Sequence, residues 1–210
     1  MRVVHYVNRF LGEIGHEEKT DMGPITAEGA IGPGVLIDRC LDGRGKVVST
    51  VICGDRYFAL KQKTAVLKVL EFARREKADI FIAGPVFEAG SYGRACGELC
   101  SVISRELGIP AVTGMPIEDP AVGLYRRDVP IVKTANDGAD MADVISRIVR
   151  IAMKMKEGHS LGTPSEEGYI PRGLKENTIT GTLAAERAID LLMKKMRGEA
   201  FVSEISIGNG

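Results

Sequence analysis

The stretch from Ala78 to Pro116 constrains the fold of this 210-residue chain more than any other segment. Its apolar run Ile80–Ala83 is typical of a strand buried on both faces. A turn rich in small residues follows, and apolar residues then recur at helical spacing from about Arg94 to Leu107. A second short strand is expected at 111–113. The segment is therefore a β-loop-α-β unit, whose crossover is expected to be right-handed.

The rest of the chain alternates in the same way. Further strands are expected at 2–7, 46–53 and 131–134, and further helices at 35–41, 60–77, 141–155 and 181–196. Residues 9–34 are interpreted mainly as a long loop, and residues 121–125 as at most one helical turn. This order predicts an α/β fold: a three-layer sandwich with a mostly parallel sheet, flavodoxin-like or Rossmann-like.

Three regions are expected along the chain. Residues 1–157 should form the α/β domain. Residues 158–180 are rich in Pro, Gly and polar residues, which favours an extended connector. Residues 181–210 are expected to add a carboxy-terminal helix and tail that pack on the same domain.

Charge and cysteine content narrow the class of protein. Lys and Arg together number 28, as do Asp and Glu, so nothing suggests a nucleic-acid partner. No apolar run reaches membrane-spanning length, and the chain starts with a strand rather than a signal peptide, so we expect no membrane contact and a cytoplasmic location. The four cysteines include no CxxC pair, which favours reduced thiols.

Polar and small residues follow several predicted strands. Parallel strands bring these ends to one edge of the sheet, where ligands bind. The helix start after Tyr92 offers free N–H groups to a carboxylate. An alternative is that the glycines of the turn from Gly84 to Gly93 only make it tight and pack the helix on the sheet. The turn contains neither a Walker loop nor a GxGxxG motif, so nucleotide binding is not indicated. The predicted binding residues for a small-molecule ligand are Asn8, Cys53, Asp55, Gly84, Phe87, Gly90, Tyr92, Gly93 and Asn136.

Two cysteines are weak catalytic candidates. Cys53 follows a strand, and Cys96 lies near a helix start, where a thiolate is stabilised. The alternative for both is a small buried hydrophobe. No catalytic residue is otherwise assigned.

The loop at 9–34 carries His16, Glu17, Glu18 and Asp21. Three interpretations remain open: a solvated loop, a metal or acid/base cluster, and an acidic helix start. No metal site is predicted, because His5, His16 and His159 are scattered. We interpret His5, inside a strand, as a core histidine.

Seven segments, in this order, resemble one family: VHYVNRF, GHEEKTDMGP, STVICGDRYF, DIFIAGPVFEAGSYGRACGELC, GIPAVTGMPIEDP, IVKTAND and EEGYIPRG. The family is the selenoprotein subunit of component B of glycine, sarcosine and betaine reductases. The resemblance covers roughly the amino-terminal half of that family's usual chain. This sequence has His16 and Glu88 where the family leads us to expect Gly and Asn.

The resemblance implies a subunit of a selenium-dependent oxidoreductase of anaerobic amino-acid fermentation. Such complexes reductively cleave the C–N bond of glycine or an N-methylated glycine. The family's selenocysteine belongs to the carboxyl half, and a pyruvoyl group belongs to a partner subunit. We therefore expect no cofactor on this chain, other reductase-complex subunits as partners, and an oligomeric assembly.

Three hypotheses follow. The chain is a substrate-facing subunit, either split from its carboxyl half or a paralogue with another task. Alternatively, it is a stand-alone binding protein for an amino-acid carboxylate, without catalysis. The third hypothesis is an independent thiol enzyme that uses Cys53 or Cys96.

Overall fold

A computed structural model describes residues 1–12, 21–88, 90–135, 138–173 and 182–200. The chain consists of two compact units, Met1–Leu174 and Lys175–Gly210. The first holds a six-stranded sheet and most of the helices. The second holds helix α8 (Ala184–Met196), whose apolar residues recur at helical spacing. How the predicted carboxy-terminal helix packs stays a prediction.

The strands of the sheet are β1 (Arg2–Asn8), β2 (Ile25–Glu28), β3 (Lys46–Cys53), β4 (Ile80–Ala83), β5 (Ala111–Met115) and β6 (Ile131–Lys133), in the order β2-β3-β1-β4-β5-β6. Five strands are parallel, and β2 pairs with β3 in the antiparallel sense. Counted along the chain, the parallel strands have the order 2-1-3-4-5. This is the flavodoxin-like order, so the predicted α/β sandwich is confirmed and the Rossmann-like order does not apply.

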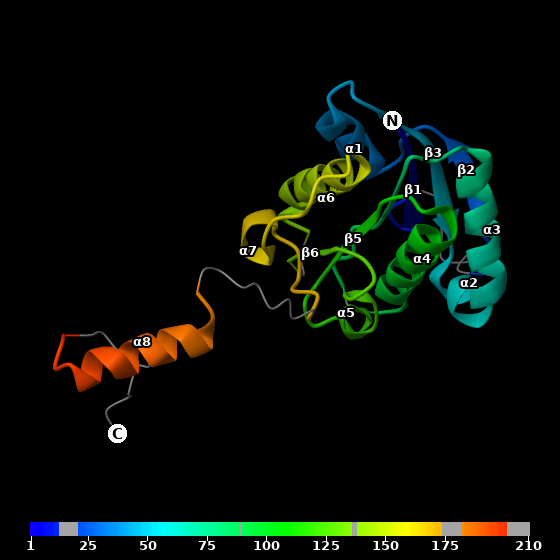
Figure 1. Ribbon diagram of the computed structural model, residues 1–210. Coiled ribbons are helices and arrows are strands. Elements are labelled where there is room, and N and C mark those ends of the chain that lie inside the picture. Colours follow the sequence, from blue (N-terminus) through cyan, green and yellow to red (C-terminus); the bar gives the residue numbers. More distant parts are fainter. Residues whose placement is uncertain (13–20, 89, 136–137, 174–181, 201–210) are drawn as a thin grey trace. The chain divides into compact units, whose positions relative to one another are not determined.

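Helices cover both faces of the sheet (Figure 1). One face packs against α1 (Gly34–Leu41) and α6 (Met141–Lys156). The other packs against α2 (Asp55–Leu60), α3 (Gln62–Arg75), α4 (Ser91–Leu107) and α5 (Pro120–Tyr125). Apolar residues of β4 alternate between the two cores: Phe81 faces α3 and α4, and Ile82 faces α6. Burial on both faces explains why this strand reads as a continuous apolar run.

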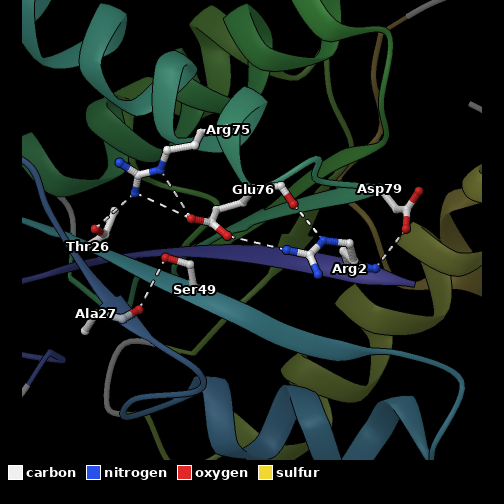
Figure 2. Close-up of polar contacts among 7 residues, drawn as sticks. All are labelled: Arg2, Thr26, Ala27, Ser49, Arg75, Glu76 and Asp79. Atoms are coloured by element: carbon white, nitrogen blue, oxygen red, sulfur yellow. Dashed lines mark hydrogen bonds and ion pairs between the residues drawn. The ribbon is translucent and has the colours of Figure 1, made fainter.

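A network of hydrogen bonds and ion pairs connects the start of β1 to the segment between α3 and β4 (Figure 2). Arg2 Nε donates to the Glu76 carbonyl over 2.6 Å, and the Arg2 N–H donates to Asp79 Oδ2 over 2.8 Å. Arg75 links the carboxylate of Glu76 to Thr26 of β2. This network lies at the amino-terminal end of β1, opposite the edge where a ligand is expected.

The predicted extended connector contains one short helix, α7 (Pro164–Glu167). The Glu167 side chain is only 4% exposed, and its carboxylate accepts a hydrogen bond from Lys154 Nζ of α6 over 2.5 Å. Just after it, the Ile170 N–H donates to the Ile131 carbonyl over 2.7 Å. Tyr169 forms a β-bridge with Val132, so this segment lies along the outer edge of β6.

Candidate functional site

A pocket of about 690 Å³ opens where β1 and β4 end. In the 2-1-3-4-5 order these two strands flank the point at which the strand order reverses, and ligands of open α/β sheets bind there. The pocket is lined by Asn8, Phe10, Leu11, Asp55, Pro85, Phe87, Glu88, Gly90, Ser91, Tyr92, Gly138 and Met141.

Asp55 supplies a half-buried carboxylate at one side of this pocket. Asn8 holds it: Asn8 Nδ2 donates to Asp55 Oδ2 over 3.2 Å, and Asn8 Oδ1 accepts from the Leu11 N–H over 3.0 Å. Asp55 Oδ1 is buried and has no hydrogen-bond partner among the described residues. Burial raises the pKa of Asp55, while the bond from Asn8 and the nearby Arg9 guanidinium oppose the shift.

The start of α4 forms another side of the pocket. Asp119, which is 2% exposed, accepts hydrogen bonds from the Gly90 N–H over 3.3 Å and from the Ala121 N–H over 2.8 Å. One buried carboxylate therefore fixes the starts of both α4 and α5. The Ser91 N–H makes no hydrogen bond within the described residues. It remains available to an anionic ligand group.

A second pocket of about 530 Å³ lies on the other side of the α4 start and shares Gly90 and Ser91 with the first. Its remaining wall comes mostly from α2 and α5 and is largely apolar, with Gln62, Arg94 and Asp119 as polar members. The two pockets thus meet at the first turn of α4.

Beneath the first pocket lies a buried group of hydroxyls and thiols. Burial raises the pKa of Tyr6 and of Cys96 well above their ordinary values, and it raises the pKa of Cys53 to about 12. Both thiols are therefore protonated at neutral pH, which argues against thiolate chemistry at either cysteine. The hydroxyls of Tyr6 and Tyr92 are buried beside these two thiols, that of Tyr6 next to Cys53 and that of Tyr92 next to Cys96.

The structure brings together five of the predicted binding residues, Asn8, Asp55, Phe87, Gly90 and Tyr92, which line the first pocket. Cys53, Gly84 and Gly93 are buried and do not line it. Asn136 lies outside the described residues, as do His16, Glu17 and Glu18 of the long loop. A binding role for any of these residues stays a prediction.

Gly84 and Gly93 have identifiable structural roles. Gly84 has a φ of +89°, a conformation that favours glycine, and its carbonyl lies 2.7 Å from His5 Nε2. A Cβ on Gly93 would lie 2.2 Å from Asp119 Oδ2. Gly93 therefore makes room for the carboxylate that fixes α4.

Several pocket residues were missed from the sequence. They are Phe10, Leu11, Pro85, Glu88, Ser91, Gly138 and Met141. A usable signal existed for Ser91, because the turn that ends at Gly90 directly precedes a helix. No such indication existed for Met141 in the sequence. This residue starts α6, and which end of α6 lies at the pocket depends on the place of β6 in the sheet.

Comparison with known proteins gives one consistent answer. Residues 1–209 match the model of the family described as glycine/sarcosine/betaine reductase selenoprotein B. The chain belongs to this family. A component B subunit gamma of the glycine reductase complex from Carboxydothermus hydrogenoformans is 42% identical over 204 residues, which are 97% of this chain and 47% of that protein.

Other relatives in the family are similar over the same extent. A sarcosine reductase complex component B subunit beta from Peptoclostridium acidaminophilum is 41% identical over 97% of this chain. A betaine reductase complex component B subunit beta from the same organism is 35% identical over 98%. This selenoprotein B family member spans about half the length of these curated relatives, 47% in each case. No solved structure matches it.

Among the described helices, none combines the length and apolar character needed to cross a bilayer. Within the described ranges, no three His, Cys, Asp or Glu side chains are grouped so that they could hold a metal ion.

For this family member we expect Gly90→Val to weaken ligand binding at least tenfold and to leave stability nearly unchanged. Nothing lies within 4 Å of a Cβ built on Gly90, and its φ of 164° is ordinary extended backbone. The isopropyl group would therefore enter the pockets that Gly90 lines without displacing protein atoms. Calorimetric titration with glycine, sarcosine and betaine, together with a thermal melt, measures both effects. Unaltered binding would place the ligand elsewhere.

Proposed function

We propose that this chain is the substrate-facing domain of component B of a glycine, sarcosine or betaine reductase. In this role it binds a small amino-acid carboxylate during reductive C–N cleavage. The observation that carries the proposal is the pocket between the ends of β1 and β4, in a chain whose relatives are component B subunits of all three reductases.

The pocket suits such a substrate chemically. It combines the Asp55 carboxylate, the Asn8 amide and the N-terminus of α4 with aromatic side chains. A small ligand that carries both an ammonium and a carboxylate can pair each end with a group of opposite charge. A volume of about 690 Å³ leaves room beside such a ligand for a reacting group from another polypeptide.

The nucleophile is proposed to come from outside this chain. Cys53 and Cys96, the candidates from the sequence, are buried thiols whose pKa values burial raises. A selenol is largely ionised near neutral pH and is a stronger nucleophile. We therefore assign the selenocysteine to a carboxyl half or partner chain, assign the pyruvoyl group to a further subunit, and place the complex in the cytoplasm.

Purification of the tagged chain from its native host under anaerobic conditions tests this proposal. We expect co-purifying subunits that include a selenoprotein or its cysteine equivalent. With a dithiol as the reductant, the reconstituted complex should release ammonia from glycine, methylamine from sarcosine or trimethylamine from betaine. A partner set without a selenol- or thiol-bearing subunit would contradict the proposal.

A second candidate function is a stand-alone binding protein for amino-acid carboxylates. It is favoured by the compactness of the first unit, Met1–Leu174, in which buried apolar clusters cover both faces of the sheet. Binding without partners and without turnover would identify this function.

A further inference from the structure

The first pocket has an uneven distribution of charge. Asp55, at the start of α2, places a carboxylate on one side. The free Ser91 N–H, at the start of the 17-residue helix α4, provides a partial positive charge on another side. The pocket therefore favours a ligand with a cationic and an anionic end.

Asp55 lacks the partners that a half-buried carboxylate needs. Oδ2 accepts from Asn8, but Oδ1 is buried and finds no partner in the described part of the chain. Arg9 lies close enough to lower the pKa of Asp55, yet the described residues include no ion pair between them. Oδ1 is thus one partner short, and a cationic ligand group placed beside this buried oxygen would compensate for the missing partner.

Aromatic side chains also line this pocket. Phe10, Phe87 and Tyr92 line it together with Asp55. Tyr92 is 8% exposed and presents a fixed ring, since it packs against Tyr6 with ring centroids 6.3 Å apart. Aromatic rings attract alkylated ammonium groups through their faces, and this attraction does not require an N–H donor.

We propose that Asp55, positioned by Asn8, is the specificity-determining residue for the ligand's cationic nitrogen, with the carboxylate at the Ser91 N–H. Phe87 contributes the surface against which N-methyl groups pack. This assignment rests on the proposed function, and it adds the orientation of the ligand within the pocket. It predicts that Asp55 acts on the nitrogen end alone.

Calorimetric titration of the full chain with five probes tests the assignment. Glycine, sarcosine and betaine carry both ends, acetate carries only the carboxylate, and tetramethylammonium carries only the cation. Asp55→Asn removes the charge but keeps the shape. We expect it to weaken glycine, sarcosine, betaine and tetramethylammonium at least tenfold and to leave acetate within threefold of wild type.

Glu118→Gln is the matched control, because Glu118 is an exposed carboxylate on the loop after β5 that lines neither pocket. It should change every affinity less than twofold. Phe87→Leu provides a second, independent variant should Asp55→Asn fold poorly. It should weaken betaine more than threefold and glycine less than twofold.

The outcomes separate the two proposals. If Asp55→Asn weakens acetate as much as glycine, or leaves glycine unchanged, the orientation is overturned while the proposed function stands. If Phe87→Leu weakens glycine and betaine equally, the role of Phe87 in methyl recognition is overturned. If the wild-type chain binds none of the five probes, the site requires a partner chain and the orientation is overturned, whereas the proposed function is contradicted only by the outcome of the purification experiment.

Discussion

Gly93→Ala is expected to lower the free energy of unfolding by about 3 kcal/mol, from overpacking and the loss of a buried hydrogen-bonded cap. The added Cβ would lie 2.2 Å from Asp119 Oδ2 and 2.7 Å from Asp119 Cγ. Asp119 cannot move away freely, because its carboxylate holds the Gly90 and Ala121 N–H groups. Chemical denaturation followed by circular dichroism measures the loss.

Gly123→Ala is the control for this variant. Gly123 lies within α5, and nothing lies within 4 Å of a Cβ built there, so alanine should stabilise the helix by up to about 1 kcal/mol. A double-mutant cycle with Asp119→Ala adds a sharper criterion. Removing the carboxylate relieves the overlap, so the two changes should cost clearly less together than the sum of their separate effects. Simple additivity would show that Gly93 is not constrained by Asp119.

Acid is expected to destabilise the fold through His5. Burial lowers the pKa of His5 from 6.5 to about 4, although the hydrogen bond with the Gly84 carbonyl acts in the opposite direction. Between these two pH values the unfolded chain binds a proton that the folded chain does not. Stability is therefore complete above about pH 6.5 and falls as the pH decreases toward 4, by about 3 kcal/mol in all.

Chemical denaturation of the wild type and of His5→Gln, repeated at several pH values, isolates the contribution of His5. Glutamine can donate to the Gly84 carbonyl but does not titrate, so the difference between the two stability curves should flatten below about pH 4. The comparison uses the difference in the free energy of unfolding between the two proteins, because other groups also titrate. The raised pKa of Asp55 makes the fold more stable as the pH falls. The lowered pKa values of Asp79 and Glu167 make it less stable at lower pH. Parallel curves between pH 6.5 and 4.5 would contradict a buried neutral His5.

The parallel part of the sheet was predictable because its signals are local. Apolar runs of four to eight residues marked β1, β3 and β4, and helical spacing marked α3 and α6. The start of α4 was placed about three residues too late, near Arg94 instead of Ser91. Its capping carboxylate belongs to Asp119, which is 29 residues from Gly90 in sequence and carried no local sign of that role.

Elements that depend on distant partners were missed. The predicted long loop at 9–34 contains β2, which has only four residues and is defined by its pairing with β3. The predicted helix at 60–77 is preceded by a separate helix, α2, which ends at Leu60. In the candidate site, strand-end residues could be anticipated from topology. The apolar lining from Leu11 and Met141 depends on how loops fold back and could not.

The contact between Tyr169 and β6 has a consequence for how other chains can attach. The backbone groups of Ile131 and Lys133 on the outer side of β6 are bonded to residues 168–170, so an incoming peptide finds no open ladder there. At the other end of the sheet, β2 offers four residues, of which Thr26 is also held by Arg75. Among the described strands, docking by strand addition is thus disfavoured at β6 and left to the short edge strand β2.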